Sequence, residues 1–169
     1  TLALHTGIRI SELVSLDVKD INWNDRSFKV IRKRGNEDIV YFDNTTERVL
    51  LDWLDERTNL KETLGITDDN EPALFISTKG RNRGTRLSVR SVERMVKKYA
   101  EIAVPEVKGM HVHSLRSTCA TNVYEKSHDL VYTKSLLGHS SVNTTMRYVK
   151  DDEQKKKDNR TLLDREKDG

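Results

Sequence analysis

Apolar residues recur at intervals of three and four near the start of the chain and again in its second half, which predicts helices in both places. Leu4 and Ile8 follow this spacing, so one helix is expected over residues 1–14. Five further residues predict an amphipathic helix over residues 87–103: Val89, Val92, Val96, Tyr99 and Ala103. Three shorter helices are expected downstream: residues 114–126, 130–137 and 142–149. Gly138 is a suitable terminator for the helix that precedes it.

Three short apolar runs predict strands, at residues 21–23, 28–31 and 39–42. Turn residues separate these runs, with Asn24-Asp25 before the second and Gly35-Asn36 before the third. Strands joined by such short turns pair in antiparallel fashion. We therefore predict a mainly helical α+β fold with a small three-stranded antiparallel sheet near the N-terminus.

The stretch after the sheet predicts one more helix and two further features. Asn44, with Glu47 three residues later, makes a capping box, and the helix that it starts is expected to run to about residue 57. Residues 73–76 are apolar and predict either a strand or an apolar anchor. Residues 80–84 predict a basic loop bounded by glycines.

The composition favours one folded domain and argues against a membrane protein. The chain has 169 residues, of which 35% are hydrophobic and 34% are charged, as is typical of a globular domain with charged faces. It contains no apolar run of the roughly 18 residues that a spanning helix requires. There is no signal-peptide pattern, and the single Cys119 cannot form an internal disulfide, so we expect a cytoplasmic protein. Because the first residue is not methionine, we expect a piece cut inside or just before a helix.

Positive charge is concentrated between residues 79 and 98, although the formal net charge of the whole chain is only +3. This basic segment contains one acidic residue, Glu93, and eight basic ones: Lys79, Arg81, Arg83, Arg86, Arg90, Arg94, Lys97 and Lys98. Clustered cations of this kind either bind nucleic-acid phosphates or form a solvated face. Six of them are candidate DNA-binding residues: Lys79, Arg81, Arg83, Arg86, Arg90 and Arg94.

Five residues spread over the chain can together perform chemistry on one phosphate: Arg9, His113, Arg116, His139 and Tyr148. Two arginines and two histidines can surround a phosphate, and a tyrosine can attack it to form a covalent link to nucleic acid. His113 and Arg116 are three residues apart, so they share one face of a helix. His139 and Tyr148 need the turn predicted around Gly138, because a continuous helix would place them on opposite sides.

Each of these residues also has an ordinary structural interpretation. Arg9 alone would most often be a surface or salt-bridged residue, and Tyr148 alone a core or surface aromatic. His111 and His113 suggest a metal pair, but no cysteine or acidic partner has ligand spacing, so zinc is rejected. Cys119 lies on the apolar side of its predicted helix, which favours a buried structural role over a nucleophilic one. The joint occurrence of the five residues, in order, favours catalysis over these interpretations.

The motifs around these residues resemble those of the tyrosine recombinase, or phage integrase, family. Three segments are similar to its sequence boxes: TGIRISEL at residues 6–13, HSLR at 113–116 and LLGH at 136–139. Tyr148, nine residues after His139, stands where the family has its nucleophile. The resemblance covers residues 6–148, and the combination is specific although each motif alone is weak.

This resemblance implies site-specific cleavage and rejoining of DNA. Arg9 and Arg116 would hold the non-bridging oxygens of the scissile phosphate while Tyr148 attacks it, which gives a 3′-phosphotyrosyl intermediate and a free 5′-hydroxyl. His113 would act as the base, and His139 would donate a hydrogen bond to the phosphate. Because the arginines perform the task of metal ions and religation reuses the phosphotyrosyl bond, neither a metal, a cofactor nor ATP is expected.

The family also places a catalytic lysine in a β-hairpin turn, where it protonates the departing 5′-oxygen. Lys33 is the candidate, because it is the only lysine at the turn between the second and third predicted strands. Matching Gly35-Asn36 to the family's common Gly-Lys-Gly-Asn turn would instead put Arg34 in the lysine's position. Glu12 is expected to brace Arg9 or another basic residue of the site, or to balance exposed charge.

The resemblance further implies double-stranded DNA as the partner, a homotetramer on DNA and a monomer for the isolated chain. Residues 1–149 would be the catalytic domain without the family's N-terminal DNA-binding half, so weak DNA binding is expected. The charged tail at residues 150–169 would dock on a neighbouring subunit through Leu162 and Leu163, or be mobile. A bacterial, phage or mobile-element origin is expected.

Two other functions stay open at this point. A type IB topoisomerase would use similar chemistry to relax supercoiled DNA without a specific site. A catalytically silent DNA-binding regulator would have lost the reaction altogether. The presence of all five core residues argues against the second of these.

Overall fold

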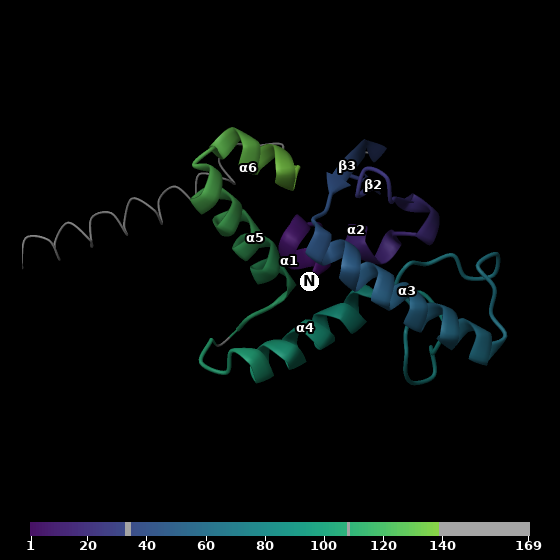
Figure 1. Cartoon of the computed structure of the whole chain (residues 1–169). Coiled ribbons are helices and arrows are strands. Elements are labelled where there is room, and N and C mark those ends of the chain that lie inside the picture. The colour runs from purple at the N-terminus through teal and green to yellow at the C-terminus, as the bar shows by residue number, and fades with distance from the viewer. Residues whose placement is uncertain (33–34, 108, 139–169) are drawn as a thin grey trace, which may run out of the picture. The chain divides into compact units, whose positions relative to one another are not determined.

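The computed structural model describes residues 1–32, 35–107 and 109–138 (Figure 1). Within them the helices and strands are α1 (Leu2–Thr6), α2 (Ile10–Ser15), the 3-10 helix η1 (Val18–Asp20), β1 (Ile21–Asn22), β2 (Ser27–Ile31), β3 (Glu37–Tyr41), α3 (Asn44–Leu64), α4 (Val89–Ala103), α5 (Val112–Ser127) and α6 (Leu130–Leu137). The chain divides into two compact units, residues 1–119 and 120–169. The predicted fold class, mainly helical with a small antiparallel sheet, is confirmed.

The N-terminal helix is interrupted, and the prediction of one helix over residues 1–14 is wrong. Gly7 ends α1 in the left-handed conformation, with φ of 63° and ψ of 17°, which glycine adopts without strain. Arg9 is extended and stands at the N-cap of α2. The apolar spacing continues through this break, so it gave no sign of the interruption. As a result, Arg9 lies on a short connection between two helices.

The three predicted strands form one sheet, in the order β1-β2-β3 and antiparallel throughout. Phe28 and Val30 of β2 are buried, and Phe28 pairs with the buried Val40 of β3. The β2–β3 hairpin is closed by the backbone of Arg32, whose N–H donates to the Asn36 carbonyl at 2.7 Å. The sheet therefore presents one apolar face to the core and carries a tight turn at one end.

The core of residues 1–119 combines this sheet with apolar residues from α2, α3 and the segment that follows α3. Phe28 stacks on Phe42, with ring centroids 5.8 Å apart. Leu16, Leu50 and Leu74 are buried in the same cluster. Burying side chains of this size removes enough apolar surface from water to contribute about 2 kcal/mol each, so this cluster is the main source of stability for the unit.

The helix α3 begins and ends at different residues from those predicted. Its N-cap is Asp43 and not Asn44, because the Asp43 carboxylate accepts a hydrogen bond from the Thr46 N–H at 2.8 Å. The helix then continues to Leu64, well beyond the predicted end near residue 57, and Gly65 terminates it in the left-handed conformation. The extension carries Arg57 and Lys61, which are charged residues but are buried.

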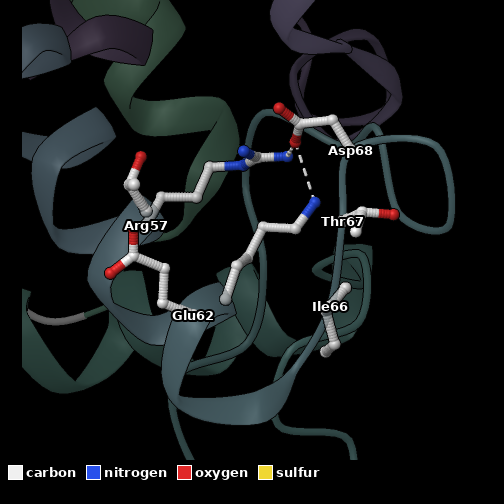
Figure 2. A pocket seen from close by; sticks show the side chains of 7 residues that line it. Arg57, Glu62, Ile66, Thr67 and Asp68 are labelled. Atoms are coloured by element: carbon white, nitrogen blue, oxygen red, sulfur yellow. Dashed lines mark hydrogen bonds and ion pairs between the residues drawn. The ribbon is translucent and has the colours of Figure 1, made fainter.

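Backbone carbonyls and one carboxylate explain the burial of these two cations, and Figure 2 shows the carboxylate, that of Asp68, beside the Arg57 side chain. The Arg57 guanidinium donates to the carbonyls of Ala73 and Glu71, and the Lys61 ammonium donates to Glu71 at 2.6 Å. Both cations also pair with the same Asp68 carboxylate oxygen, at 2.7 Å and 2.8 Å. A surface cavity of about 180 Å³ lies beside them. These contacts attach the segment after α3 to the helix.

The segment after α3 leads to the remaining helices. Residues 73–76 make only isolated bridges, and Ala73, Leu74 and Ile76 are buried, so this stretch is an apolar anchor and not a strand. Residues 80–84 lie in a loop, as predicted, that Ser77 closes by donating its N–H to the Thr85 carbonyl at 2.8 Å. The helix α4 starts one residue after its cap, Ser88.

The last two described helices agree with the sequence pattern within a few residues. The helix α5 begins at Val112, two residues before the predicted start, and in the second unit α6 has the predicted bounds. Gly138 terminates α6 with φ of 58°, as predicted. The predicted helix at 142–149 and the tail at 150–169 lie outside the described residues. Over the described part of the chain, no helix has the length and apolar character needed to span a membrane.

Candidate functional site

The side chain of Arg116 contacts the break between α1 and α2, which also holds Arg9. Arg116 of α5 donates a hydrogen bond from Nη1 to the carbonyl oxygen of Gly7, a residue 109 positions earlier. Gly7 is buried, and Arg9 follows it by two residues. The bond therefore joins the HSLR segment to the TGIRISEL segment, as one site built from both would require.

Arg9 is held in place by Glu12. The Arg9 N–H donates to one Glu12 carboxylate oxygen at 3.0 Å, and its Nη1 donates to the other oxygen at 2.7 Å. The Arg9 side chain is 29% exposed, whereas that of Glu12 is only 5% exposed. The expectation that Glu12 braces Arg9 is confirmed, although the geometry is that of a helix N-terminus and not of two residues within one helix.

A second cation, Arg32, shares the same carboxylate. Its Nη1 lies 3.3 Å from Glu12 Oε2, and its Nε donates to Asp38 at 2.9 Å. The sequence analysis did not single out Arg32, but its position in the strand contained a signal. Phe28 and Val30 are the buried apolar residues of β2, and side chains two apart in a strand lie on the same face. The next position on that face is Arg32, and it is almost fully buried.

The helix α5 presents His113 one turn before Arg116. His113 is exposed, and its ring lies edge-on to that of His111, with centroids 6.0 Å apart. His111 Nδ1 accepts the Ser114 N–H at 3.2 Å, so His111 works as a local cap of the helix. Among the residues that the structure describes, no three histidine, cysteine or acidic side chains are grouped to hold a metal ion.

Cys119 is buried, in agreement with the predicted structural role. Burial raises the pKa of its thiol, while the positive charge of Arg116 acts in the opposite direction. A thiol with a raised pKa stays protonated at neutral pH and is a poor nucleophile.

Three predicted site residues, Lys33, His139 and Tyr148, lie outside the described residues, as does the alternative Arg34. The described part of the site therefore consists of Arg9, Glu12 and Arg32 around the buried carboxylate, with His113 and Arg116 on α5.

The basic segment at residues 79–98 is mostly open to solvent. Five of the six candidate DNA-binding residues are exposed: Lys79, Arg81, Arg83, Arg90 and Arg94. The first three belong to the loop before α4 and the last two belong to α4 itself. Exposed cations on a loop and the adjoining helix are free to approach a phosphate backbone without first breaking an internal structure.

Arg86 differs from the other five because it is used inside the protein. Its guanidinium donates to the carbonyls of Val14 and Leu16, at 3.0 Å and 3.2 Å, and pairs with Asp17 at 2.5 Å. These contacts connect the end of α2 to the segment before α4. Arg86 therefore has a structural role, and its part in DNA binding stays a prediction.

The sequence profile of the Phage integrase family matches residues 1–155, and the chain therefore belongs to this family. It is 38% identical over 143 residues to the tyrosine recombinase XerC of Shewanella amazonensis, covering 85% of this chain and 44% of that protein. It is 36% identical over 145 residues to XerC of Vibrio cholerae, covering 85% of this chain and 42% of the relative. The chain thus spans less than half the length of these relatives.

Solved structures share the fold. The crystal structure of XerA recombinase matches with a TM-score of 0.72 and 31% identity, over 86% of this chain and 50% of that one. The XerH site-specific recombinase, in a post-cleavage complex with its palindromic difH substrate, matches with a TM-score of 0.77 and 25% identity, over 96% of this chain and 44% of that one. The described fold is accordingly that of a tyrosine recombinase catalytic domain.

Proposed function

We propose that the chain is the catalytic part of a site-specific DNA recombinase, which cleaves and rejoins double-stranded DNA through a 3′-phosphotyrosyl intermediate. The observation that supports this proposal most is the hydrogen bond from Arg116 to the Gly7 carbonyl, because it links α5 to the segment that contains Arg9. Family membership and the names of the XerC and XerH relatives support the same reaction class.

In this proposal Arg9 and Arg116 hold the two non-bridging oxygens of the scissile phosphate. Both side chains are fixed by internal hydrogen bonds, so little reorganisation is needed as charge develops in the transition state. Tyr148 attacks the phosphorus, His113 accepts the phenolic proton, and Lys33 donates a proton to the departing 5′-oxygen. His139 donates a hydrogen bond to the phosphate.

The reaction in this proposal needs neither a metal ion, a cofactor nor ATP. The two guanidiniums supply the positive charge that a metal ion supplies in other phosphoryl-transfer sites. The energy of the broken phosphodiester bond is kept in the phosphotyrosyl bond, and the free 5′-hydroxyl attacks that bond during religation.

The DNA partner would be held partly by the exposed cations of the basic segment. Lys79, Arg81 and Arg83 on the loop and Arg90 and Arg94 on α4 would contact phosphates, which position a duplex without reading its sequence. We further propose that four copies assemble on the DNA, with residues 150–169 as the segment that contacts a neighbour, and that the isolated chain is a monomer. Light scattering with and without the DNA tests this assembly.

Covalent trapping tests the proposed reaction. The complete gene product is incubated with a random-sequence library of nicked duplexes in the presence of EDTA, and wild type is compared with Tyr148→Phe on a denaturing gel. An adduct that forms despite the chelator and that requires Tyr148 supports both the nucleophile and the independence from metal. An adduct that survives in Tyr148→Phe, or no adduct with wild type, contradicts the proposal.

Sequencing of the trapped duplexes separates this proposal from a topoisomerase. A recombinase enriches one sequence, whereas an enzyme of type IB topoisomerase character traps many sequences and relaxes any supercoiled plasmid. A protein that binds the library without a covalent product would instead be a DNA-binding regulator.

A further inference from the structure

One buried carboxylate serves two guanidiniums at the site. Arg9 Nη1 lies 2.7 Å from Glu12 Oε1, and Arg32 Nη1 lies 3.3 Å from Glu12 Oε2. The Glu12 and Arg32 side chains are only 5% and 9% exposed, so water screens their interaction weakly. Asp38, which also pairs with Arg32, is 41% exposed and is screened much more strongly.

Arg32 affects the balance of charge around Arg9. If Glu12 paired with Arg9 alone, the two charges would cancel and Arg9 would attract a phosphate only weakly. Counted alone, Arg9, Glu12 and Arg32 carry a formal charge of +1. Asp38, which pairs with Arg32 at 2.9 Å, brings the sum over the four side chains to zero, but its carboxylate is 41% exposed and water screens its charge. Arg9 is the more exposed of the two cations and can present positive charge to a ligand.

We propose that Arg32 is a positioning residue for DNA cleavage: by sharing the Glu12 carboxylate, it keeps the Arg9 guanidinium oriented and positively charged toward the scissile phosphate. This inference rests on the proposed function and adds to it a residue that acts through another. Arg32 does not itself contact the phosphate.

The β2–β3 hairpin keeps Arg32 in the required place. The Arg32 N–H donates to the Asn36 carbonyl at 2.7 Å, and its own carbonyl accepts the Gly35 N–H at 3.2 Å. Ile31, the residue before it, pairs with Glu37 across the two strands. The Arg32 backbone is thus hydrogen-bonded within the hairpin, and its guanidinium is linked to α2 through Glu12.

The orientation and charge of Arg9 matter during the cleavage step. A new bond forms between the Tyr148 oxygen and phosphorus while the bond to the 5′-oxygen breaks, and the electron pair leaves with that oxygen. The phenolic proton passes to His113, and the 5′-oxygen takes a proton from Lys33. Meanwhile both non-bridging oxygens carry negative charge, and Arg9 and Arg116 stabilise one oxygen each.

A methylphosphonate substrate isolates the contribution that passes through Arg9. Replacing one non-bridging oxygen with a methyl group removes one negative charge, so the arginine that faces that position has no charge left there to stabilise. A duplex recovered by covalent trapping is prepared with a normal phosphodiester and with each methylphosphonate diastereomer at the scissile position. Single-turnover adduct formation is measured for wild type, Arg32→Gln and Lys29→Gln.

Lys29 provides the matched control, because it is a cation of the same hairpin whose partner is the exposed Glu37, at 2.6 Å. Arg32→Gln is expected to slow adduct formation on the phosphodiester by about 10- to 100-fold, which is less than the loss of a direct donor. On the diastereomer that lacks the oxygen facing Arg9, the adduct-formation rate of Arg32→Gln is expected to lie within about threefold of the wild-type rate. Lys29→Gln is expected to change neither rate by more than about twofold.

The outcomes separate the two proposals. The role of Arg32 would be overturned if Arg32→Gln slowed adduct formation equally on all substrates, or if it reacted with the phosphodiester at the wild-type rate. Either result would leave the proposed function standing. A wild-type protein that forms no adduct on any substrate overturns the proposed function and this inference together. Arg32→Met, which keeps the apolar stem of the side chain, repeats the comparison in case Arg32→Gln does not fold, and thermal melts identify that case.

Discussion

Two groups of buried charges in residues 1–119 differ in which partner is kept from water. Around Glu12 the carboxylate is buried and Arg9, one of its two cations, is partly exposed. Around Asp68 the arrangement is reversed, because the Arg57 and Lys61 side chains are 3% and 5% exposed while the carboxylate is 64% exposed. Both groups consist of two cations and a shared carboxylate, yet they suit different tasks.

The difference shows how burial assigns a role to a cation. Arg57 and Lys61 use their donors on the backbone carbonyls of Glu71 and Ala73, so they hold two segments together. Arg9 pairs with the buried carboxylate of Glu12 while its own side chain is partly exposed, which is the arrangement that a ligand-binding cation needs. Changes in the Asp68 group should therefore affect stability assays, and changes in the Glu12 group should affect cleavage assays.

Removal of Arg116 should have the largest effect on cleavage and the clearest bearing on this contrast. Arg116→Ala is expected to lower the single-turnover rate of adduct formation by about 10³-fold, because one charged donor to the phosphate is lost. Arg48→Ala, at an exposed position of α3, is the control and should react at the wild-type rate. A loss of less than tenfold would contradict a direct role for Arg116.

Removal of Arg57 should affect stability. Arg57→Met is expected to lower the free energy of unfolding by about 3 kcal/mol, because the Ala73 carbonyl loses its side-chain donor and the Glu71 carbonyl keeps only Lys61. Urea denaturation measures this change, and Arg48→Met on the same helix should alter it by less than about 0.5 kcal/mol. A stable Arg57→Met protein would show that burial of a cation does not identify a structural role here.

The exposed cations of the basic segment are a third case, because replacing them should alter neither the free energy of unfolding nor the rate of the chemical step. Changing Arg90 and Arg94 together to glutamine is expected to weaken DNA binding about tenfold and to reduce the slope of log affinity against log salt by about 2. Fluorescence anisotropy at several salt concentrations measures both quantities. An unchanged salt slope would mean that these residues do not contact phosphates.

The smallest effect expected is the pH dependence that Asp68 confers. Hydrogen bonds from Lys61 and Arg57 lower the pKa of Asp68 below its ordinary value of 3.8. Its contribution to stability is therefore complete above that value and is lost as the pH falls through the lower pKa of the folded protein. Because the carboxylate is largely exposed, we expect about 1 kcal/mol or less. The difference in unfolding free energy between wild type and Asp68→Asn should shrink below about pH 4. A constant difference would contradict the pairing.

Local patterns predicted the sheet and most helices because each of those elements follows its own periodicity. Alternating apolar residues and the turn at Gly35-Asn36 were enough for the hairpin, and Gly138 was enough for the end of α6. The break at Gly7 was missed because the apolar spacing continues across it. The true length of α3 was missed because Arg57 and Lys61 resemble solvated residues until the carbonyls that bind them are known.

Residues of the candidate site could be predicted where they belong to a sequence motif, and could not where only packing places them. The TGIRISEL and HSLR segments identified Arg9 and Arg116, and the structure brings those two segments together. Arg32 was missed because it belongs to no motif, although its position after Phe28 and Val30 put it on the buried face of β2. The internal contacts of Arg86 could not be predicted, because its sequence neighbours are exposed cations whereas its own partners lie about 70 residues earlier.

The most direct test of the account is a double-mutant cycle on Arg9 and Arg116, read as the single-turnover rate of adduct formation on a trapped duplex. If both arginines act on one phosphate, Arg9→Ala and Arg116→Ala should each cost about 10²- to 10³-fold, and the double variant should lose far less than the product of the two. Losses that multiply would mean that the two residues act independently, which would contradict a single site formed where Arg116 meets Gly7.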